Sequence, residues 1–321
     1  MRKAYVIAGC LSDDNKREIE KTAGECGFEV SFFDTDQEAS GKVSDAEVIY
    51  CNGPALFKEM PGLKWCHSMS AGVGHFLVSG AFEKGDIILT NSSGSYGLVI
   101  SEYVIMATLM LMRRIPEYEE VIDRREWIQN LPVRSIAGSS IAIIGTGNIG
   151  SNAALRYKAL GAERVIGFSR SGRQAEGFDE VFRLNDYGEI MGGQRFDVLL
   201  LCVPGTSESK GLLNRERLAM LSDRTLVINV GRGTVIDQDA LIDALNNGAI
   251  AGAALDVVYP EPLPEDSPLW TAKNLILTPH ISGDMGLPHT VDLTVEIFCD
   301  NLRRYVRGEE LTHIVDVNAG Y

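Results

Sequence analysis

Three glycines, Gly145, Gly147 and Gly150, form the spacing G-x-G-x-x-G directly after a hydrophobic segment at residues 139–145. In this pattern the first glycine permits a tight turn, the second lets the backbone approach a pyrophosphate, and the third lets a helix pack closely on the strand. The first turn of that helix offers free N–H groups and a partial positive charge to phosphate. A glycine-rich turn without a ligand is the alternative, but a second strand about 20 residues further on favours dinucleotide binding.

The segment after this second strand indicates which dinucleotide is bound. An Asp or Glu there would accept a hydrogen bond from the ribose 2′-OH of NAD and repel a 2′-phosphate. The chain has instead Ser169, Arg170 and Ser171, and the next acidic residue is Glu176. Because hydroxyls and a guanidinium favour a phosphate dianion, we expect NADP(H) as the preferred cofactor, with use of NAD(H) left open. The alternative is that Arg170 stacks on adenine or faces solvent.

These motifs belong to a series of short β-branched segments that alternate with segments of helical length. Such alternation predicts a parallel sheet with helices on both faces. Six strands are expected in this part of the chain, as in a dinucleotide-binding fold, at residues 139–145, 164–168, 197–203, 225–230, 251–257 and 274–278. A long apolar helix at residues 98–112 precedes them, and the helical pattern continues after Pro116.

The beginning of the chain shows the same alternation, and Ser12 is expected to cap a helix there. Five further strands are expected at residues 4–9, 28–33, 46–51, 63–69 and 86–90. An amphipathic helix at residues 286–307 is expected to return to this first sheet. The fold class is therefore α/β, with two Rossmann- or flavodoxin-like domains, each a parallel sheet flanked by helices. An NAD(P)-binding domain that starts with a hinge helix, residues 98–285, is inserted into a domain made of residues 1–97 and 286–321.

The composition disfavours several classes of protein. Among 321 residues, 30 Lys and Arg stand against 44 Asp and Glu, and the formal net charge of −14 disfavours nucleic acid and anionic lipid as partners. No apolar run reaches the ~18 residues of a membrane span, and the start of the chain lacks the apolar core of a signal peptide, so we expect a cytoplasmic protein. The six cysteines form no C-x-x-C pair and the histidines lack metal-binding spacings, so neither disulfides nor a metal site are expected.

Three later segments complete the pattern begun by the glycine turn: residues 229–245, 254–270 and 275–283. Together the four motifs closely resemble the D-isomer-specific 2-hydroxyacid dehydrogenase family, which includes glyoxylate/hydroxypyruvate reductases and phosphoglycerate dehydrogenases. The resemblance implies that Arg232, Glu261 and His280 are catalytic. Arg232 would bind the carboxylate and carbonyl oxygen of a 2-oxo acid, and His280 would protonate that oxygen. Glu261 would orient the imidazole and favour its charged form.

The resemblance also implies binding residues. The backbone amides of Ala71, Gly72 and Val73 would bind the substrate carboxylate, together with Arg232 and His280. Besides the motifs already described, cofactor contacts are implied at Asn148, Ile149, Val203, Pro204, Val230, Gly231, Asp256 and Gly283. Asp256 would hydrogen-bond the nicotinamide carboxamide, and a cap at the end of a strand is the alternative for this residue. The remaining histidines lack a partner motif and are interpreted as structural or surface residues: His67, His75, His289 and His313.

We therefore expect an enzyme that prefers NADPH and reduces small 2-oxo acids of the glyoxylate or hydroxypyruvate type to D-2-hydroxy acids, with a histidine as general acid and base. Alternatives are another activity of the family, on branched 2-oxo acids or phosphoglycerate, and an NAD(P)H-sensing, corepressor-like binding protein. A homodimer is expected through the helix at residues 98–112 and the arm around Trp127, which in relatives can approach the partner's site. Packing of Trp127 within its own subunit is the alternative.

Overall fold

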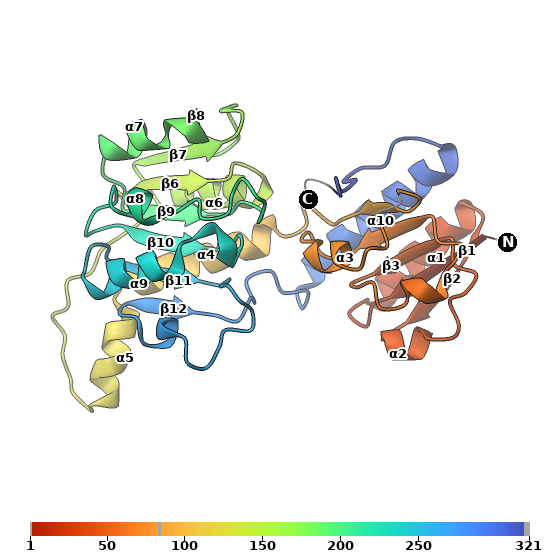
Figure 1. The fold of residues 1–321 in the computed structure, drawn as a ribbon, viewed down its shortest axis with the longest axis horizontal. Helices are drawn as coiled ribbons and strands as arrows, with labels where there is room; N and C mark the ends of the chain where they lie inside the picture. Colours follow the sequence, from red (N-terminus) through yellow and green to blue (C-terminus); the bar gives the residue numbers. More distant parts are fainter. Residues whose placement is uncertain (1, 83–84, 318–321) are drawn as a thin grey trace. The chain divides into compact units, whose positions relative to one another are not determined.

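The computed structural model of the protein describes residues 2–82 and 85–317. The chain divides into two compact units (Figure 1). Unit 1 comprises the chain up to Tyr96 and again from Asp284 onward, and unit 2 comprises Gly97–Gly283. The sequence predicted domain boundaries after residues 97 and 285. In the structure the boundaries between the two units fall after residues 96 and 283.

Unit 1 is built on a parallel sheet of five strands in the order β2-β1-β3-β4-β5. The strands are β1 (Arg2–Ile7), β2 (Phe28–Phe33), β3 (Val48–Cys51), β4 (Trp65–Ser68) and β5 (Ile88–Thr90). All five strands predicted for this part of the chain are confirmed, because each carries the β-branched or aromatic residues that suit a pleated, buried surface. Three short elements were not expected: α2 (Asp36–Ala39), the 3₁₀ helix η1 (Phe57–Glu59) and α3 (Gly74–Leu77).

Two long helices, α1 (Asp13–Glu25) and α10 (Pro288–Arg307), pack on one face of this sheet. Ser12 caps α1 as predicted: its Oγ accepts a hydrogen bond from the Asn15 amide, and the Asn15 side chain accepts one from the Ser12 amide, both at 3.1 Å. The buried apolar residues of α10 recur every three or four positions, at Val291, Val295, Phe298 and Leu302. Helix α10 therefore completes the core of unit 1, the sheet to which the sequence predicted it would return.

Unit 2 contains a parallel sheet of seven strands in the order β12-β11-β10-β9-β6-β7-β8. The strands are β6 (Ser140–Ile144), β7 (Arg164–Ser169), β8 (Glu180–Arg183), β9 (Val198–Leu201), β10 (Leu226–Asn229), β11 (Gly252–Leu255) and β12 (Leu275–Leu277). The six expected strands are present, and β8 is a seventh strand that was not predicted. This strand lies at the edge of the sheet and has a charged residue at each end, so it lacks the apolar run that identified the others.

Helices and 3₁₀ helices surround this sheet. They are α4 (Gly97–Met112), α5 (Ile115–Asp123), α6 (Asn148–Ala159), η2 (Leu184–Asp186), α7 (Tyr187–Gly192), α8 (Arg215–Leu218), η3 (Gly233–Val235), α9 (Gln238–Asn246) and η4 (Pro268–Thr271). Helix α4 packs on α6, where the hydroxyls of Thr108 and Tyr157 lie 2.6 Å apart. The helix expected to continue from α4 is interrupted at Arg114, whose left-handed φ of +59° turns the chain into the separate helix α5.

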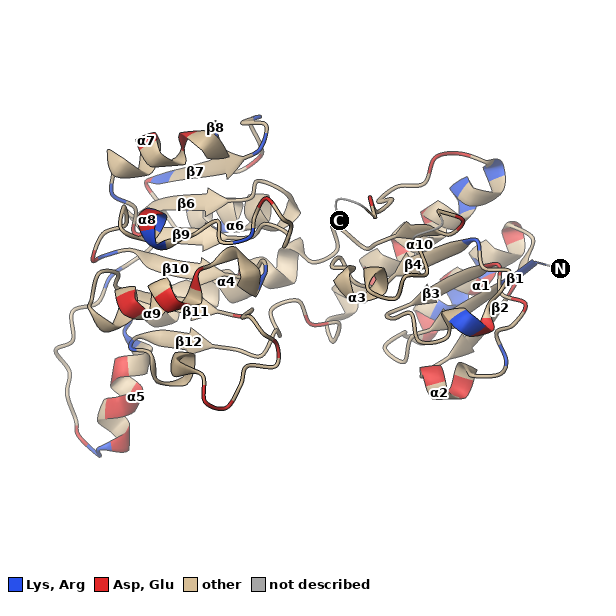
Figure 2. Cartoon of the chain, in the orientation of Figure 1, with Lys and Arg blue, Asp and Glu red and all other residues tan. Residues whose placement is uncertain are grey.

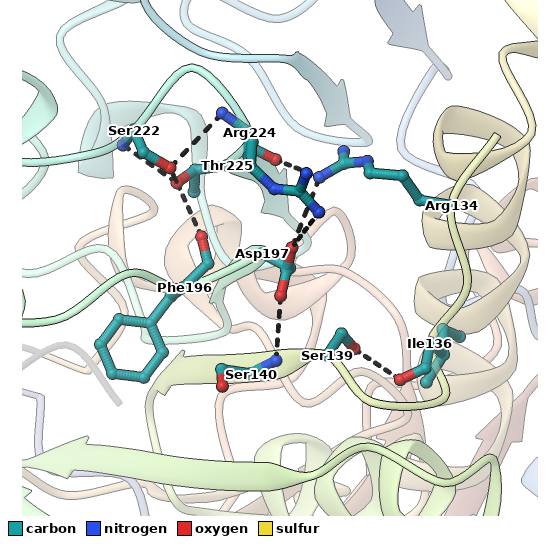
Figure 3. A network of polar contacts seen from close by, with 9 residues as sticks. All are labelled: Arg134, Ile136, Ser139, Ser140, Phe196, Asp197, Ser222, Arg224 and Thr225. Carbon is teal, nitrogen blue, oxygen red and sulfur yellow. Dashed lines mark hydrogen bonds and ion pairs between the residues drawn. The ribbon is translucent and has the colours of Figure 1, made fainter. Parts of the chain in front are cut away.

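An arm without helix or strand, residues 124–139, joins α5 to β6. Near its end, Arg134 lies with Arg224 beside Asp197, at the amino ends of the neighbouring strands β6, β9 and β10 (Figure 3). Asp197 Oδ1 lies 3.6 Å from Arg134 Nη1 and 3.5 Å from Arg224 Nη2, and Oδ2 accepts a hydrogen bond from the Ser140 amide at 3.1 Å. This network attaches the end of the arm to the sheet.

Charged side chains are spread over both units (Figure 2). Acidic residues are prominent on α2, α5 and α9, whereas basic residues are prominent on α8 (Figure 2). Within the described residues, none of the helices combines the length and the apolar character that crossing a membrane requires.

Candidate active site

The G-x-G-x-x-G segment forms the turn from β6 into α6. Gly145 has a φ of +108°, a backbone conformation that favours glycine. A Cβ on Gly150 would overlap the carbonyl oxygen of Gly145, so the third glycine lets the helix pack directly on the turn. Around Gly147, which caps α6, no heavy atom lies within 4 Å of the place of a Cβ. This open space at the first turn of α6, which includes Asn148 and Ile149, fits a pyrophosphate.

The residues expected to select the cofactor lie at the carboxyl end of β7, which ends at Ser169, and directly after it. The Ser169 Oγ accepts a hydrogen bond from the Gly172 amide (3.0 Å) and closes a turn that carries Arg170 and Ser171. Arg170 lines a cavity of about 810 Å³, which is within the usual size of a ligand site. Five further charged residues line this cavity: Arg183, Lys210, Arg217, Glu208 and Glu216. Arg183 was not identified from the sequence, because this residue ends β8, a strand that was not predicted.

Four more residues expected at the cofactor lie beyond the carboxyl ends of β9 and β10: Val203, Pro204, Val230 and Gly231. A Cβ on Gly231 would approach the backbone of Val203 within 3.0 Å, so these two segments pack backbone to backbone. The Cys202 Sγ donates a hydrogen bond to the carbonyl oxygen of Gly145 (3.2 Å) and so joins the end of β9 to the glycine turn. The structure therefore brings these residues to the edge of the sheet that carries the glycine turn.

Arg232 follows β10 in an extended conformation and is partly buried. Its Nη1 donates a hydrogen bond to the Gly231 carbonyl oxygen at 2.7 Å. Burial lowers the pKa of the Arg232 guanidinium, an effect that the negative charge of Glu261 opposes. On the next residue, Gly233, a Cβ would overlap the backbone of Val258. This glycine therefore lets the segment of Arg232 pack against the segment that leads to Glu261.

Glu261 and His280 form a hydrogen-bonded pair. Nδ1 of His280 lies 2.8 Å from Oε2 of Glu261, and Oε1 of the same carboxylate accepts a hydrogen bond from the Val258 amide at 3.1 Å. A carboxylate only accepts, so it favours a proton on Nδ1 and leaves Nε2 of the neutral ring as an acceptor. The pair can therefore orient the imidazole and leave Nε2 to exchange a proton with a ligand.

The buried carboxylate of Asp256 holds the turn that carries His280. Its Oδ1 accepts hydrogen bonds from the Ile281 amide (2.9 Å) and from Oγ1 of Thr278 (2.6 Å), and its Oδ2 accepts one from the Ser282 amide (2.9 Å). Its backbone oxygen accepts a hydrogen bond from the His280 amide at 2.9 Å. These are the contacts of a cap at the end of a strand, one of the two roles expected for Asp256, and its contact with nicotinamide stays a prediction.

The backbone of His280 itself is strained. Its φ is +57°, a left-handed conformation that is uncommon for residues other than glycine and costs about 1–3 kcal/mol. Such a conformation persists where the surrounding contacts over-determine it, as the hydrogen bonds to Asp256 do here. The turn ends at Gly283, the last residue of unit 2.

The loop expected to bind the substrate carboxylate, Ala71–Val73, lies in unit 1 after β4. The side chain of Asn91 donates a hydrogen bond to the Ala71 carbonyl oxygen (2.9 Å), and the hydroxyl of Tyr96 donates one to that of Met69 (2.8 Å). The backbone N–H groups of Ala71 and Gly72 donate no hydrogen bond to an acceptor within residues 2–82 and 85–317. Consecutive N–H groups in such a loop suit an anion.

His67 is a structural residue, as expected from the sequence. It is fully buried, with Nδ1 2.7 Å from Oγ1 of Thr90 and Nε2 3.2 Å from Oγ of Ser92. Because Ser92 donates its own proton to the Ser68 carbonyl oxygen (2.8 Å), its oxygen accepts from Nε2. Burial lowers the pKa of His67 to about 3, so the ring is neutral at pH 7. The other three histidines interpreted in this way are exposed: His75, His289 and His313.

The chain matches a family model described as the NAD binding domain of D-isomer specific 2-hydroxyacid dehydrogenase, over residues 105–282. A hydroxypyruvate reductase from Blautia hydrogenotrophica is 28% identical over 284 residues, which cover 85% of this chain and 86% of that protein.

Solved structures show similarity over almost the whole chain. A D-isomer specific 2-hydroxyacid dehydrogenase family protein from Aeromonas salmonicida has a TM-score of 0.84 and 32% identity, covering 98% of this chain and 99% of that one. An NADPH-dependent glyoxylate/hydroxypyruvate reductase from Sinorhizobium meliloti, in complex with NADP and sulfate, has a TM-score of 0.81 and 28% identity, covering 100% of both chains. The chain therefore belongs to the D-isomer-specific 2-hydroxyacid dehydrogenases, a family of NAD(P)-dependent oxidoreductases.

Proposed function

We propose that this protein reduces small 2-oxo acids of the glyoxylate or hydroxypyruvate type to D-2-hydroxy acids, with NADPH as the preferred cofactor. The observation that carries the proposal is the hydrogen-bonded pair of His280 and Glu261. Arg232 follows β10, Glu261 follows β11 and His280 follows β12. These strands belong to the sheet that also carries the glycine turn. Ligands of open α/β sheets bind beyond the carboxyl ends of the strands. Relatives named hydroxypyruvate reductase and glyoxylate/hydroxypyruvate reductase A support the substrate class.

In the proposed reaction each side chain has one task. Arg232 binds the carboxylate and the carbonyl oxygen of the 2-oxo acid with its planar guanidinium. The carbonyl carbon receives a hydride, which NADPH would supply when bound. His280 donates a proton from Nε2 to the carbonyl oxygen and accepts it in the reverse reaction. Glu261 keeps the ring oriented through Nδ1 and stabilises its positive charge.

The surroundings of Arg170 support the preference for NADPH. The lining of its cavity contains four cationic side chains, Arg170 among them, and two carboxylates, so basic groups are in excess: Arg183, Lys210, Arg217, Glu208 and Glu216. Guanidinium and ammonium groups favour the extra phosphate that distinguishes NADPH from NADH. Solved relatives from Sinorhizobium meliloti and Xanthobacter autotrophicus Py2 contain NADP and NADPH, respectively. The use of NAD(H) as a weaker cofactor is part of the same proposal.

We further propose a homodimer formed through α4, α5 and the arm. These segments expose the apolar side chains of Met106, Leu109, Ile122, Trp127, Ile128 and Val133. Trp127 is 91% exposed, so it is not packed within its own subunit, which was the alternative considered from the sequence. Burial of such exposed apolar side chains favours association, and two-fold pairs are the commonest oligomers.

Substitution of the proposed catalytic pair tests the reaction. His280→Gln is expected to lower kcat for 2-oxo acid reduction by roughly 10² to 10⁴ while the Kd of NADPH changes little, because the proton donor is lost and the cofactor site is intact. Glu261→Gln, which keeps the shape and removes the charge, is expected to lower kcat by a smaller factor. The measurements are NADPH oxidation with glyoxylate, hydroxypyruvate, branched 2-oxo acids and phosphohydroxypyruvate, and NADPH binding by fluorescence.

Glu265→Gln provides the control, because Glu265 is an exposed acid in the same loop and loses the same charge. Its kcat is expected to equal that of the wild type. Tight NADPH binding without turnover of any 2-oxo acid would contradict the proposal and favour the corepressor-like alternative. Turnover confined to phosphohydroxypyruvate or branched 2-oxo acids would correct the substrate class.

The cofactor preference is tested at Arg170. The wild type is expected to have a lower KM for NADPH than for NADH. Arg170→Asp is expected to raise the KM for NADPH roughly ten- to a hundredfold and to reverse the preference, because a charge-assisted hydrogen bond is lost and a repulsive charge is gained. Arg195→Asp makes the same charge change at an exposed position before β9 and is expected to leave the ratio unchanged. Equal use of both cofactors by the wild type would overturn the preference.

Substitutions at two glycines of the turn, Gly147 and Gly150, test cofactor binding and folding separately. Gly147→Ala is expected to leave the free energy of unfolding nearly unchanged, since its Cβ meets nothing, but to weaken NADPH binding by about tenfold or more, since the Cβ enters the space proposed for the pyrophosphate. Gly150→Ala is expected to lower the free energy of unfolding by about 1–3 kcal/mol, because its Cβ overlaps the carbonyl oxygen of Gly145. Urea unfolding and NADPH titration measure the two effects. Unchanged binding in Gly147→Ala would place the pyrophosphate elsewhere.

The dimer is tested by its molar mass in solution. Multi-angle light scattering at micromolar concentration is expected to give twice the mass of one chain for the wild type. Trp127→Ser combined with Met106→Glu is expected to shift the protein towards the monomer, because these changes remove apolar area and add a charge to the proposed interface. A monomeric wild type would contradict the proposal.

A further inference from the structure

A chain of hydroxyl groups connects helix α4 to the turn that carries His280. Oη of Tyr103, a buried residue of α4, lies 2.6 Å from Oγ1 of Thr278, and this Oγ1 lies 2.6 Å from Oδ1 of Asp256. Burial raises the pKa of Tyr103 to about 12, so the phenol keeps its proton at pH 7. The Asp256 carboxylate only accepts, so Thr278 gives its single hydroxyl proton to Asp256 and must accept the proton of Tyr103. The direction of both hydrogen bonds is therefore fixed.

Asp256 is the acceptor on which the His280 turn depends. Its carboxylate accepts hydrogen bonds from the Ile281 and Ser282 amides, and its backbone carbonyl oxygen accepts one from the His280 amide. These bonds hold His280 at its left-handed φ of +57°, which is costly for a residue other than glycine. A contact that fixes the carboxylate of Asp256 therefore also fixes the two residues that follow His280, and with them the turn that presents the imidazole.

We propose that Tyr103 is a positioning residue for His280, which acts through Thr278 and Asp256 and holds the turn in the geometry that proton transfer requires. The inference rests on the proposed function, in which His280 is the general acid. Without the phenol hydroxyl, the Thr278 oxygen loses its donor and Asp256 loses the support of a fixed neighbour. A displacement of about 1 Å at a reacting group can cost up to about 10²-fold in rate.

The chain contains a matched control for this substitution. Tyr157 is also buried, and its hydroxyl lies 2.6 Å from Oγ1 of Thr108, which like Tyr103 belongs to α4. Tyr103→Phe and Tyr157→Phe each remove one buried hydroxyl from a Tyr–Thr pair, so both are expected to lower the Tm by similar amounts. Only Tyr103→Phe is expected to lower kcat, by about tenfold, with the KM for NADPH within about twofold of the wild type. Equal kcat values in the two variants would overturn the proposal.

A double-mutant cycle shows whether Tyr103 acts through His280. In the His280→Gln background, Tyr103→Phe is expected to change kcat by less than about twofold, because the group that it positions is already absent. A merely structural role would lower kcat by the same factor with and without His280, and this result would contradict the proposal.

A readout that does not depend on turnover separates this inference from the proposed function. The ring C–H signals of His280 in a ¹H–¹³C NMR spectrum can be assigned by their loss in His280→Gln. Tyr103→Phe is expected to shift or broaden these signals, whereas Tyr157→Phe is expected to leave them in place. If the wild type reduces no 2-oxo acid, the proposed function fails while this comparison still decides the role of Tyr103. Unchanged His280 signals in Tyr103→Phe would overturn that role.

Discussion

All strand pairs in unit 2 are parallel, and this constraint decides where the chemistry of the unit can lie. Parallel strands direct their carboxyl ends to one edge, so segments far apart in the sequence follow one another there. The glycine turn follows β6, Arg232 follows β10, and His280 follows β12. The amino ends of β6, β9 and β10 carry instead the ion pairs of Asp197, which attach the arm to the sheet (Figure 3). One edge thus collects the proposed catalytic groups and the other an anchoring network.

The parts of the fold that depend on buried apolar surface could be predicted from the sequence. A strand covered on both faces needs a continuous run of apolar residues, and a helix that packs on a sheet needs a repeated apolar face, as α10 shows. Strand β8 was not predicted, because an edge strand of four residues with charged ends does not need a continuous run of apolar residues. Arg183, which lines the cavity beside Arg170, was missed with it.

The polar contacts around His280 could be predicted only where a known motif carries them. The pairing of His280 with Glu261 followed from the resemblance, but the bond between Tyr103 and Thr278 joins residues 175 positions apart. Its existence depends on how α4 packs on the sheet, which no local pattern specifies. The left-handed backbone of His280 could not be predicted from the sequence either. Residues other than glycine favour a negative φ, and the hydrogen bonds to Asp256 override this preference.

The negative net charge of the chain opposes the binding of anions, but the charges close to the site decide whether an anion binds. A protein of net charge −14 is proposed to bind two anions, a dinucleotide and a 2-oxo acid. At physiological ionic strength, exposed charges are largely screened beyond about 8 Å, so the groups within the site decide binding. Helices α1 and α9 have acidic residues in their first turns, where they stabilise the helix, but the first turn of α6 has none. The N-terminus of α6 is thus left without a carboxylate of its own, and its N–H groups and partial positive charge stay available to a phosphate.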